Sequence, residues 1–244
     1  MSEYALELSE AEVFRYQKMA EMALSTEREM WTSAGIVEGA IVADVGCGPG
    51  AISVVLAGLV GPAGRVYAVD RGAEARAAAA AAAGRAGAEN VTVTAGDADD
   101  TGLAPSSVDV VMIRHVLAHN GGREEAIVGH AASLVLPGGS VYLVDIEGAA
   151  IRMRPSDPDV EDLNDRYWQW HEVMGNDLSV GLRLGELLAG AGLEVLHFSG
   201  RYQMFQMPVG LRARLWPALR IGVGPRGPGC QWRADLVREP EGPM

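Results

Sequence analysis

Apolar and polar positions alternate along the first 150 residues in blocks that predict strands separated by helices. The strand blocks are almost continuously apolar, as in AIVADV (40–45), and do not alternate with polar residues. Strands of this kind are buried on both faces, so they predict a parallel sheet covered by helices on both sides. The predicted strands are 40–45, 65–70, 90–100, 107–119 and 140–148, and the predicted helices are 5–31, 51–60, 72–87 and 123–139.

This regular alternation lapses near residue 150. Asp157 and Pro158 predict the start of a further helix. In that helix an apolar stripe recurs at helical spacing and is expected to face the core. The stripe consists of Leu163, Tyr167, Trp170 and Met174. A helix and a long strand are expected up to about residue 205, then a short helix at 210–221, a Gly- and Pro-rich turn at 222–229 and a last strand at 231–238.

The charge of the chain argues against a nucleic acid as its substrate. The 244 residues include 32 acidic and 20 basic side chains, for a formal net charge of −12. A nucleic-acid-binding surface needs clustered basic residues. Only a modest group is present, Arg212, Arg214 and Arg220. Lys18 is the only lysine, which disfavours Schiff-base chemistry unless that one residue performs it.

Cysteine usage and hydropathy predict a cytoplasmic protein. Cys47 lies in a glycine-rich stretch and Cys230 in a Gly- and Pro-rich tail, so no disulfide framework is expected. Neither cysteine has companions at metal-ligand spacing, and no metal is expected. The N-terminal residues are acidic, unlike a secretory signal, and no apolar run is long enough to cross a membrane.

The stretch VADVGCGPG (42–50) combines an acid with three glycines at alternate positions. Counting Ala51, it also satisfies the loose dinucleotide pattern G-x-G-x-x-G/A, so NAD, FAD, S-adenosylmethionine and a structural turn are all alternatives. Asp44 stands two residues before the first glycine, where it would repel a pyrophosphate. The same carboxylate would attract a ligand that carries an ammonium and a sulfonium. Pro49 also lacks a backbone N–H that a phosphate would use.

The stretch resembles the first motif of the class I S-adenosylmethionine-dependent methyltransferases, which reads acid-x-Gly-x-Gly-x-Gly after the first strand. Later segments resemble the next motifs of this family in the same order: VYAVD (66–70), Gly96-Asp97-Ala98, VDVVMIRHVLAH (108–119) and LVLPGGSVYLVD (134–145). The resemblance covers about residues 30–200 and is to the small-molecule, ubiquinone-methyltransferase-like type. It implies a Rossmann-like α/β fold with a seven-stranded, mostly parallel sheet, helices on both faces and an antiparallel last strand. An N-terminal helical segment and a lid insertion after strand five complete the expected fold.

The same resemblance implies S-adenosylmethionine as the cofactor and S-adenosylhomocysteine as its product. Asp44 is expected near the ammonium, and Asp70 at the ribose hydroxyls. Asp97, with Asp99 and Asp100 as alternatives, is expected at the adenine amine. Arg114 is expected at the methionine part. The full expected cofactor set is Tyr16, Asp44, Gly46, Cys47, Gly48, Asp70, Arg71, Gly96, Asp97, Ala98 and Arg114.

Methyl transfer from a sulfonium is an in-line displacement, for which a protein supplies alignment and, for some acceptors, a base. His115, just past the fourth strand, is the first candidate base, and a structural hydrogen-bonding role is its alternative. His171 is the second candidate. The residues expected at the acceptor are His119, Trp168, His171 and Tyr202. IRHVL stands where an Asn/Asp-Pro-Pro-Tyr/Phe motif would follow strand four, which disfavours DNA-adenine or glutamine methylation.

One methyltransferase domain is expected over residues 1–244. Its expected parts are an N-terminal helical cap (1–35), a cofactor-binding core (36–148), a substrate lid (149–180) and the C-terminal part of the sheet (181–244). The expected function is methyl transfer to an O, N or C atom of a medium-sized apolar or aromatic small molecule, with no nucleic-acid or membrane partner.

Two alternatives to this function stay open. The first is an NAD(P)-dependent oxidoreductase, which Asp44, Pro49 and the missing Tyr-x-x-x-Lys pair disfavour. The second is a non-catalytic binding protein of methyltransferase fold. The sequence determines neither the acceptor nor the oligomeric state, a homodimer included.

Overall fold

A computed structural model describes residues 10–148 and 158–201 of the chain. The elements below belong to one compact unit, Glu7–Phe198. The strands in these described ranges are β1 (Ile41–Val45), β2 (Arg65–Asp70), β3 (Val91–Ala95), β4 (Val108–Arg114) and β5 (Val135–Val144). The α-helices are α1 (Glu10–Ser33), α2 (Ala51–Val60), α3 (Ala73–Ala86), α4 (Glu124–Leu134), α5 (Pro158–Val173) and α6 (Leu184–Gly190). Short 3₁₀ turns lie at η1 (Leu117–His119) and η3 (Val180–Arg183).

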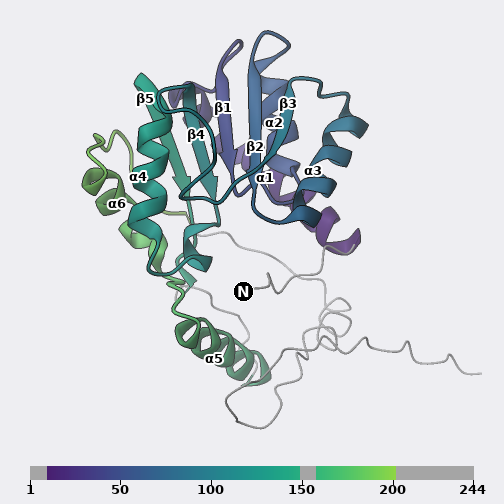
Figure 1. Cartoon of the computed structure of the whole chain (residues 1–244). Helices are drawn as coiled ribbons and strands as arrows, with labels where there is room; N and C mark the ends of the chain where they lie inside the picture. Colours follow the sequence, from purple (N-terminus) through teal and green to yellow (C-terminus); the bar gives the residue numbers. More distant parts are fainter. Residues whose placement is uncertain (1–9, 149–157, 202–244) are drawn as a thin grey trace, which may run out of the picture. The chain divides into compact units, whose positions relative to one another are not determined.

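The described strands form one sheet in the order β3-β2-β1-β4-β5, with every neighbouring pair parallel (Figure 1). The chain runs outward from β1 to β3, then crosses back to β4 on the other side of β1. The sheet order therefore reverses between β1 and β4. In open parallel sheets, ligands bind beyond the carboxyl ends of the strands at such a reversal.

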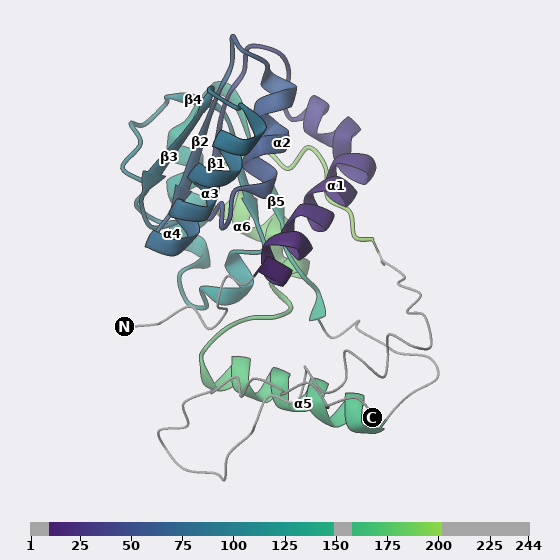
Figure 2. The same ribbon diagram turned by 90° about the vertical axis from the view of Figure 1, so that its right-hand side faces the viewer.

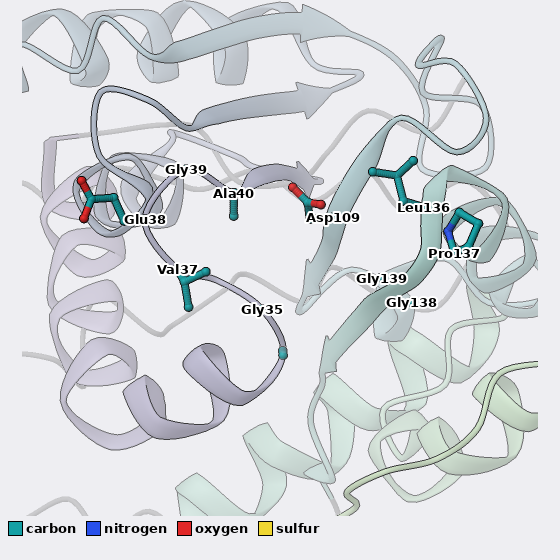
Figure 3. A pocket seen from close by; sticks show the side chains of 11 residues that line it. Gly35, Val37, Glu38, Gly39, Ala40, Asp109, Leu136, Pro137, Gly138 and Gly139 are labelled. Atoms are coloured by element: carbon teal, nitrogen blue, oxygen red, sulfur yellow. The ribbon is translucent and has the colours of Figure 1, made fainter.

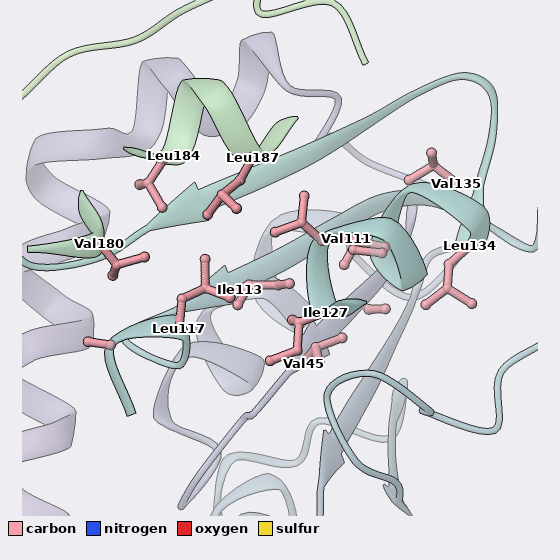
Figure 4. Packing of buried hydrophobic residues seen from close by; sticks show 14 of the residues in the cluster. Val45, Val111, Ile113, Leu117, Ile127, Leu134, Val135, Val180, Leu184 and Leu187 are labelled. Atoms are coloured by element: carbon pink, nitrogen blue, oxygen red, sulfur yellow. The ribbon is translucent and has the colours of Figure 1, made fainter. Parts of the chain in front are cut away.

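Helices cover both faces of the sheet, as the continuous apolar strands predicted (Figures 1 and 2). Helices α1 and α2 bury Trp31, Leu56 and Val60 with β1 and β4 in one cluster. Helices α4 and α6 cover the opposite face, where Ile127 and Leu187 pack on the other side of the same strands (Figure 4). None of the described helices has the combination of length and apolar character that crossing a bilayer requires.

Two predicted boundaries are wrong by several residues. The fourth strand ends at Arg114, not at residue 119, because the chain turns at His115 into the 3₁₀ turn η1. The fourth helix ends at Leu134, not at residue 139. The Pro-Gly-Gly of 137–139 instead lies inside an irregularity of β5, where the pairing jumps from Val108↔Val135 to Val110↔Ser140.

The predicted sixth strand is also wrong in the part that the structure describes. Residues 193–201 have no regular secondary structure, although the helix before them ends near Gly190 as expected. The predicted helix at 210–221 and last strand at 231–238, with its antiparallel direction, lie outside the described residues. The parallel, five-stranded α/β sheet is thus the fold of the described chain.

Candidate functional site

Asp44 lies at the end of β1, next to the reversal of the sheet. Its side chain is almost fully buried and accepts a hydrogen bond from Ser53 Oγ at 2.6 Å. Burial raises the pKa of Asp44 from 3.8 to about 6, while the Ser53 bond and the positive charge of Arg114 oppose that rise. A carboxylate in so apolar a place favours a cationic partner.

The three glycines of the loop after β1 have different roles. All three have positive φ, which L side chains rarely adopt. A Cβ on Gly50 would lie 2.8 Å from the Ala79 backbone of α3, and one on Gly46 would collide with the Val116 side chain. At Gly48, by contrast, a Cβ would meet nothing within 4 Å. Gly46 and Gly50 therefore allow close packing, whereas Gly48 borders open space where a ligand can approach the backbone.

Asp70, the last residue of β2, fixes this loop. Its Oδ2 accepts the Gly48 N–H at 2.9 Å, and its Oδ1 accepts the Gly72 N–H at 2.8 Å. Each carboxylate oxygen can accept further bonds, so Asp70 can also bind a ligand hydroxyl. Arg71 follows with an exposed side chain, and its carbonyl oxygen accepts a bond from Arg76.

The loop after β3 is anchored by an arginine that the sequence analysis did not single out. Arg123 binds Asp99 through both carboxylate oxygens, at 3.1 and 2.5 Å, and binds Asp97 Oδ1 at 2.9 Å. The hydrogen bonds from Arg123, together with its positive charge, lower the pKa of Asp99. Asp97 Oδ1 also accepts the Ala98 N–H. Gly96 packs closely, because a Cβ there would lie 2.6 Å from the Thr101 carbonyl oxygen.

Arg114, the last residue of β4, forms an ion pair with Glu27 of α1. Its two Nη atoms lie 2.5 and 3.1 Å from the Glu27 carboxylate oxygens, and both side chains are mostly buried. Tyr142 and Trp31 donate to the same carboxylate at 3.0 and 3.2 Å. Burial and the Glu27 charge raise the pKa of Tyr142, which keeps its hydroxyl a donor. This network ties α1 to the carboxyl ends of β4 and β5.

His115 follows directly in a left-handed backbone conformation, with φ of 54°. For a residue other than glycine this costs about 1–2 kcal/mol. Strained residues of this kind concentrate at functional sites. The His115 N–H donates to the Val144 carbonyl at 2.8 Å. Burial lowers the pKa of the imidazole, which the nearby carboxylate of Asp145 opposes, so the direction favours the neutral form.

Asp145 accepts hydrogen bonds from the turn that follows His115. Its Oδ2 accepts the backbone N–H groups of Leu117 and Ala118 at 2.9 and 3.3 Å, and its Oδ1 accepts the Ile146 N–H at 2.9 Å. Burial raises the pKa of Asp145, and these three bonds work in the opposite direction. The carboxylate thus holds η1 beside His115.

His119, at the end of η1, meets His171 of α5. The two rings lie 5.2 Å apart between centroids. His171 is buried, and its Nδ1 is 3.0 Å from Asn176 Nδ2, so Nδ1 is the acceptor of an amide proton. Burial, with a smaller contribution from His119, lowers the pKa of His171 to about 4. Burial lowers the pKa of His119 as well. Within the described part of the chain, no group of three or more His, Cys, Asp or Glu is arranged to hold a metal ion.

Two of the residues in the apolar stripe predicted on α5 do not face the core. Tyr167 and Met174 are exposed, at 39% and 53% of their surface. Trp168 and His171 lie inward instead: Trp168 packs on the α4–α6 cluster and against Gly148. Helical periodicity identified two faces of this helix and assigned the wrong one to the core, because burial is decided by the neighbour and not by the helix itself.

The remaining predicted site residues are Tyr16, Cys47 and Tyr202. The Arg15 guanidinium lies 4.7 Å from the centroid of the Tyr16 ring, and its charge also acts on the Tyr167 hydroxyl of α5. Cys47 is buried, and burial raises the pKa of its thiol, which keeps it protonated and unreactive. Tyr202 lies outside the described residues.

A pocket of about 450 Å³ opens at the opposite, amino-terminal edge of the strands (Figure 3). Its lining includes Glu38, Asp109, Leu136 and Pro137. Asp109 is engaged there by the Ile41 N–H at 2.8 Å. The pocket is remote from the strand ends that carry Asp44 and Asp70, and the reversal of the sheet, not this pocket, marks the candidate site.

Glu27, Arg123 and Asp145 are the functional candidates that sequence reasoning missed. Glu27 and Arg114 are 87 residues apart, and Arg123 is 26 residues from Asp97. No local spacing signals such pairs. Asp145 carried a signal, because it directly follows the fifth strand, much as Asp44 and Asp70 lie at or next to the ends of the first and second strands.

Comparison with known proteins identifies the family of this site. The family model described as "Methyltransferase domain" matches residues 36–183, more than half of the chain. The chain belongs to the methyltransferase domain family. Residues 36–183 form an S-adenosylmethionine-dependent methyltransferase domain, as the ordered motifs predicted.

Individual relatives agree with this assignment. A probable cobalt-precorrin-6B C(15)-methyltransferase (decarboxylating) of Methanothermobacter thermautotrophicus is 33% identical over 107 residues, which are 43% of this chain and 52% of that protein. The match thus spans about half the length of this curated relative.

Solved structures share the fold. A SAM-dependent methyltransferase of Aquifex aeolicus is similar with a TM-score of 0.54 and 21% identity, over 73% of this chain and 86% of the other. A chain from the complex between the Haloferax volcanii Trm112 methyltransferase activator and its proposed methyltransferase gives a TM-score of 0.54 and 20% identity, over 73% and 72% of the two chains. At these identities the likeness concerns the fold alone.

The loop geometry fits S-adenosylmethionine better than a dinucleotide. Gly48 leaves the backbone open to a ligand, and the buried carboxylate of Asp44 stands at the same loop. Ser53, the third residue of α2, donates to Asp44, so the start of this helix presents an acid rather than a bare N-terminus. A pyrophosphate would meet that acid, whereas an ammonium or sulfonium is attracted to it.

Proposed function

We propose that this protein transfers a methyl group from S-adenosylmethionine to an oxygen, nitrogen or carbon atom of a medium-sized, apolar or aromatic small molecule. The observation that supports this most is His115, a half-buried histidine with a strained backbone that directly follows β4 and whose imidazole interacts with the charge of Asp145. S-adenosylmethionine supplies an already activated methyl group, so the chain has to align the acceptor and, for an O–H or N–H acceptor, take its proton.

In this proposal residues at the ends of different strands bind different parts of the cofactor. Asp44 attracts the ammonium, and Arg114 binds the carboxylate of the methionine part. Asp70 accepts bonds from the ribose hydroxyls, and Asp97 accepts one from the adenine amine. The remaining proposed contacts are Tyr16, Gly46, Cys47, Gly48, Arg71, Gly96 and Ala98.

The acceptor is proposed to bind between η1 and α5. His115 removes the proton, because its lowered pKa leaves the imidazole neutral and able to accept at physiological pH. Asp145 stabilises the imidazolium that results, since its charge opposes the effect of burial on His115. His119, Trp168 and His171 form an apolar and aromatic wall. Tyr202, the segment 149–180 as a lid, and an antiparallel last strand complete the proposal.

A labelled-methyl transfer assay tests this function. Phenols, hydroxyquinones, aromatic amines and corrin-type precursors are offered with labelled S-adenosylmethionine, beside tRNA and rRNA as macromolecular acceptors. We expect product from at least one small aromatic class and none from the RNAs. Labelled RNA without labelled small molecule overturns the proposed acceptor class.

With a substrate in hand, His115→Gln tests the base. Loss of a general base lowers kcat by about 10²–10⁴-fold, with little change in cofactor affinity. Glu125→Gln, an exposed change at the start of α4, is the control. Turnover of His115→Gln near that of the control removes His115 as the base and leaves the methyl acceptor class untouched.

A further inference from the structure

The loop that follows β3 holds three acids, and the structure separates their roles. Asp99 has both carboxylate oxygens bound to Arg123, at 2.5 and 3.1 Å. Asp97 uses only Oδ1, which accepts from Arg123 and from the Ala98 N–H. Among the described residues, its Oδ2 receives no hydrogen bond. Asp97 therefore keeps an acceptor for a ligand, whereas Asp99 does not. Asp100 is exposed, and its backbone pairs with that of Asp97.

Arg123 reaches this loop from a different part of the fold. It is the residue before α4, preceded by Gly121 and Gly122, and it belongs to the connection that begins at η1. Its backbone N–H donates to the Asn120 carbonyl oxygen at 3.0 Å, and its Nη1 lies 3.5 Å from Asn120 Oδ1. The planar guanidinium, with five donors in a fixed fork, holds two carboxylates in one geometry.

An ion pair of this exposure is a weak source of stability. The Arg123 side chain is 35% exposed, and those of Asp97 and Asp99 are 38% and 27% exposed. Exposed pairs contribute little to folding unless their geometry is bidentate or networked. This one is both, and it lies at the carboxyl end of β3, where the adenine of the cofactor is proposed to bind. This geometry can hold the loop together and orient Asp97 at the same time, and a comparison of ligand preference with stability separates the two roles.

We infer that Arg123 is a positioning residue that sets the adenine specificity of the cofactor site. It anchors on Asp99 and fixes Asp97 Oδ1, so that Oδ2 is presented to the exocyclic amine of adenine. A fixed carboxylate accepts from an amine and repels a carbonyl oxygen at the same position. This inference rests on the proposed contact of Asp97 with the adenine.

The test compares two ligands whose bases differ at C6 and, as a consequence, at the proton on N1. S-adenosylhomocysteine carries the amine, and S-inosylhomocysteine carries a carbonyl oxygen in its place. Calorimetry measures both dissociation constants for the wild-type chain, Arg123→Gln, Asp97→Asn and Arg183→Gln. Arg183 is the matched control, because its ion pair with Asp177 is similarly exposed and lies on η3.

The wild-type chain is expected to prefer S-adenosylhomocysteine by roughly 10–100-fold, the worth of a hydrogen bond to a charged group plus the avoided repulsion. In Arg123→Gln that preference falls at least fivefold, because Asp97 can turn away from either ligand. Arg183→Gln keeps the wild-type preference. Thermal unfolding of each variant confirms that it is folded, and Arg123→Lys, which keeps the charge without the fork, is expected to recover only part of the preference.

The outcomes distinguish the positioning role of Arg123 from the proposed contact of Asp97 with the adenine. An equal loss of affinity for both ligands in Arg123→Gln means a merely structural role and overturns the inference. An unchanged or increased preference overturns it too. If Asp97→Asn leaves the preference unchanged, the adenine contact of Asp97 itself is wrong. Failure of the wild-type chain to bind S-adenosylhomocysteine contradicts the cofactor assignment instead.

Discussion

At the scale of single residues, the site is built from groups whose surroundings differ although their sequence context is similar. Gly46, Gly48 and Gly50 share positive φ, yet only Gly48 borders open space. Asp44 and Asp70 both end strands of the sheet. Asp44 is buried against one hydroxyl, whereas Asp70 ties two backbone N–H groups and is only half-buried. A charged ligand therefore meets two acids of different character.

Alanine at Gly48 is expected to weaken cofactor binding more than it lowers the stability of the fold. Left-handed backbone costs an alanine about 1–2 kcal/mol at either Gly48 or Gly50. At Gly50 the contact with Ala79 adds about 1–3 kcal/mol of overpacking. Denaturant unfolding should thus find Gly50→Ala the less stable variant. Calorimetry should find the larger loss of S-adenosylhomocysteine affinity in Gly48→Ala, and equal affinities for the two variants would contradict the open approach at Gly48.

Cofactor affinity is expected to rise with pH through the titration of Asp44. Burial raises its pKa from 3.8 to about 6, so the folded chain favours the protonated form. Without cofactor, that contribution to stability is full below pH 3.8 and is lost as the pH rises through 6. The ammonium of the cofactor favours the carboxylate, so binding strengthens over the same window. Calorimetry with S-adenosylhomocysteine from pH 5 to 7.5 checks this. The Asp44→Asn variant should bind S-adenosylhomocysteine weakly, with an affinity that does not change over this pH range.

At the scale of elements, α1, the start of α4 and the end of α5 converge on the carboxyl edge of the sheet through ion pairs and a contact between two rings. Glu27 ties α1 to β4, Arg123 ties the start of α4 to the loop after β3, and His171 ties α5 to η1. These contacts join segments that share no strand pairing. They make the cofactor edge more polar than the two apolar layers that cover the sheet.

The pair of Glu27 and Arg114 is expected to show strong coupling in unfolding experiments. Replacing one partner by leucine leaves a mostly buried, unpaired charge, which destabilises by about 3–5 kcal/mol. The double variant Glu27→Leu/Arg114→Leu removes both charges and should recover most of that loss. Urea unfolding of the two single variants and the double variant measures the coupling. The exposed pair of Lys18 and Glu21 is the control, and Glu21→Gln should change the free energy of unfolding by less than about 1 kcal/mol. If the losses of the two single variants at Glu27 and Arg114 simply add in the double variant, the coupling is contradicted.

At the scale of the whole molecule, the order of strands and the net charge decide what reaches the site. The reversal between β1 and β4 brings residues 44, 70, 97 and 114 to one edge of the sheet. The chain as a whole carries a net charge of −12. A field of that sign attracts cations and repels phosphate backbones.

The intact chain is accordingly expected not to bind RNA. Fluorescence anisotropy with labelled tRNA and an rRNA fragment at low salt should give no saturable signal at micromolar protein. The same preparation should gain thermal stability with S-adenosylhomocysteine, since a ligand at 100 times its dissociation constant stabilises by about 2.7 kcal/mol. RNA affinity that falls steeply with salt would reveal a phosphate-binding surface and contradict the expectation.

The sequence by itself determined the order of the first five strands and of the helices between them, the parallel sheet and the cofactor. These follow from local features: the continuous apolar strands, the helical spacing between them, and glycines and acids at strand ends such as Asp44 and Asp70. Local spacing is enough there because the hydrogen bonds of a helix join residues four positions apart, and a short, continuous apolar run marks a buried strand whichever element covers it.

Only the tertiary structure decided which polar groups meet. It paired Arg114 with Glu27 across 87 residues and Asp97 with Arg123 across 26. It also turned Trp168 and His171 of α5 inward and placed His115 in a strained conformation. The physical reason is the same in each case. The partner of a side chain is selected by the packing of distant elements, and a repeat along one helix shows that it has two faces without showing which of them is covered.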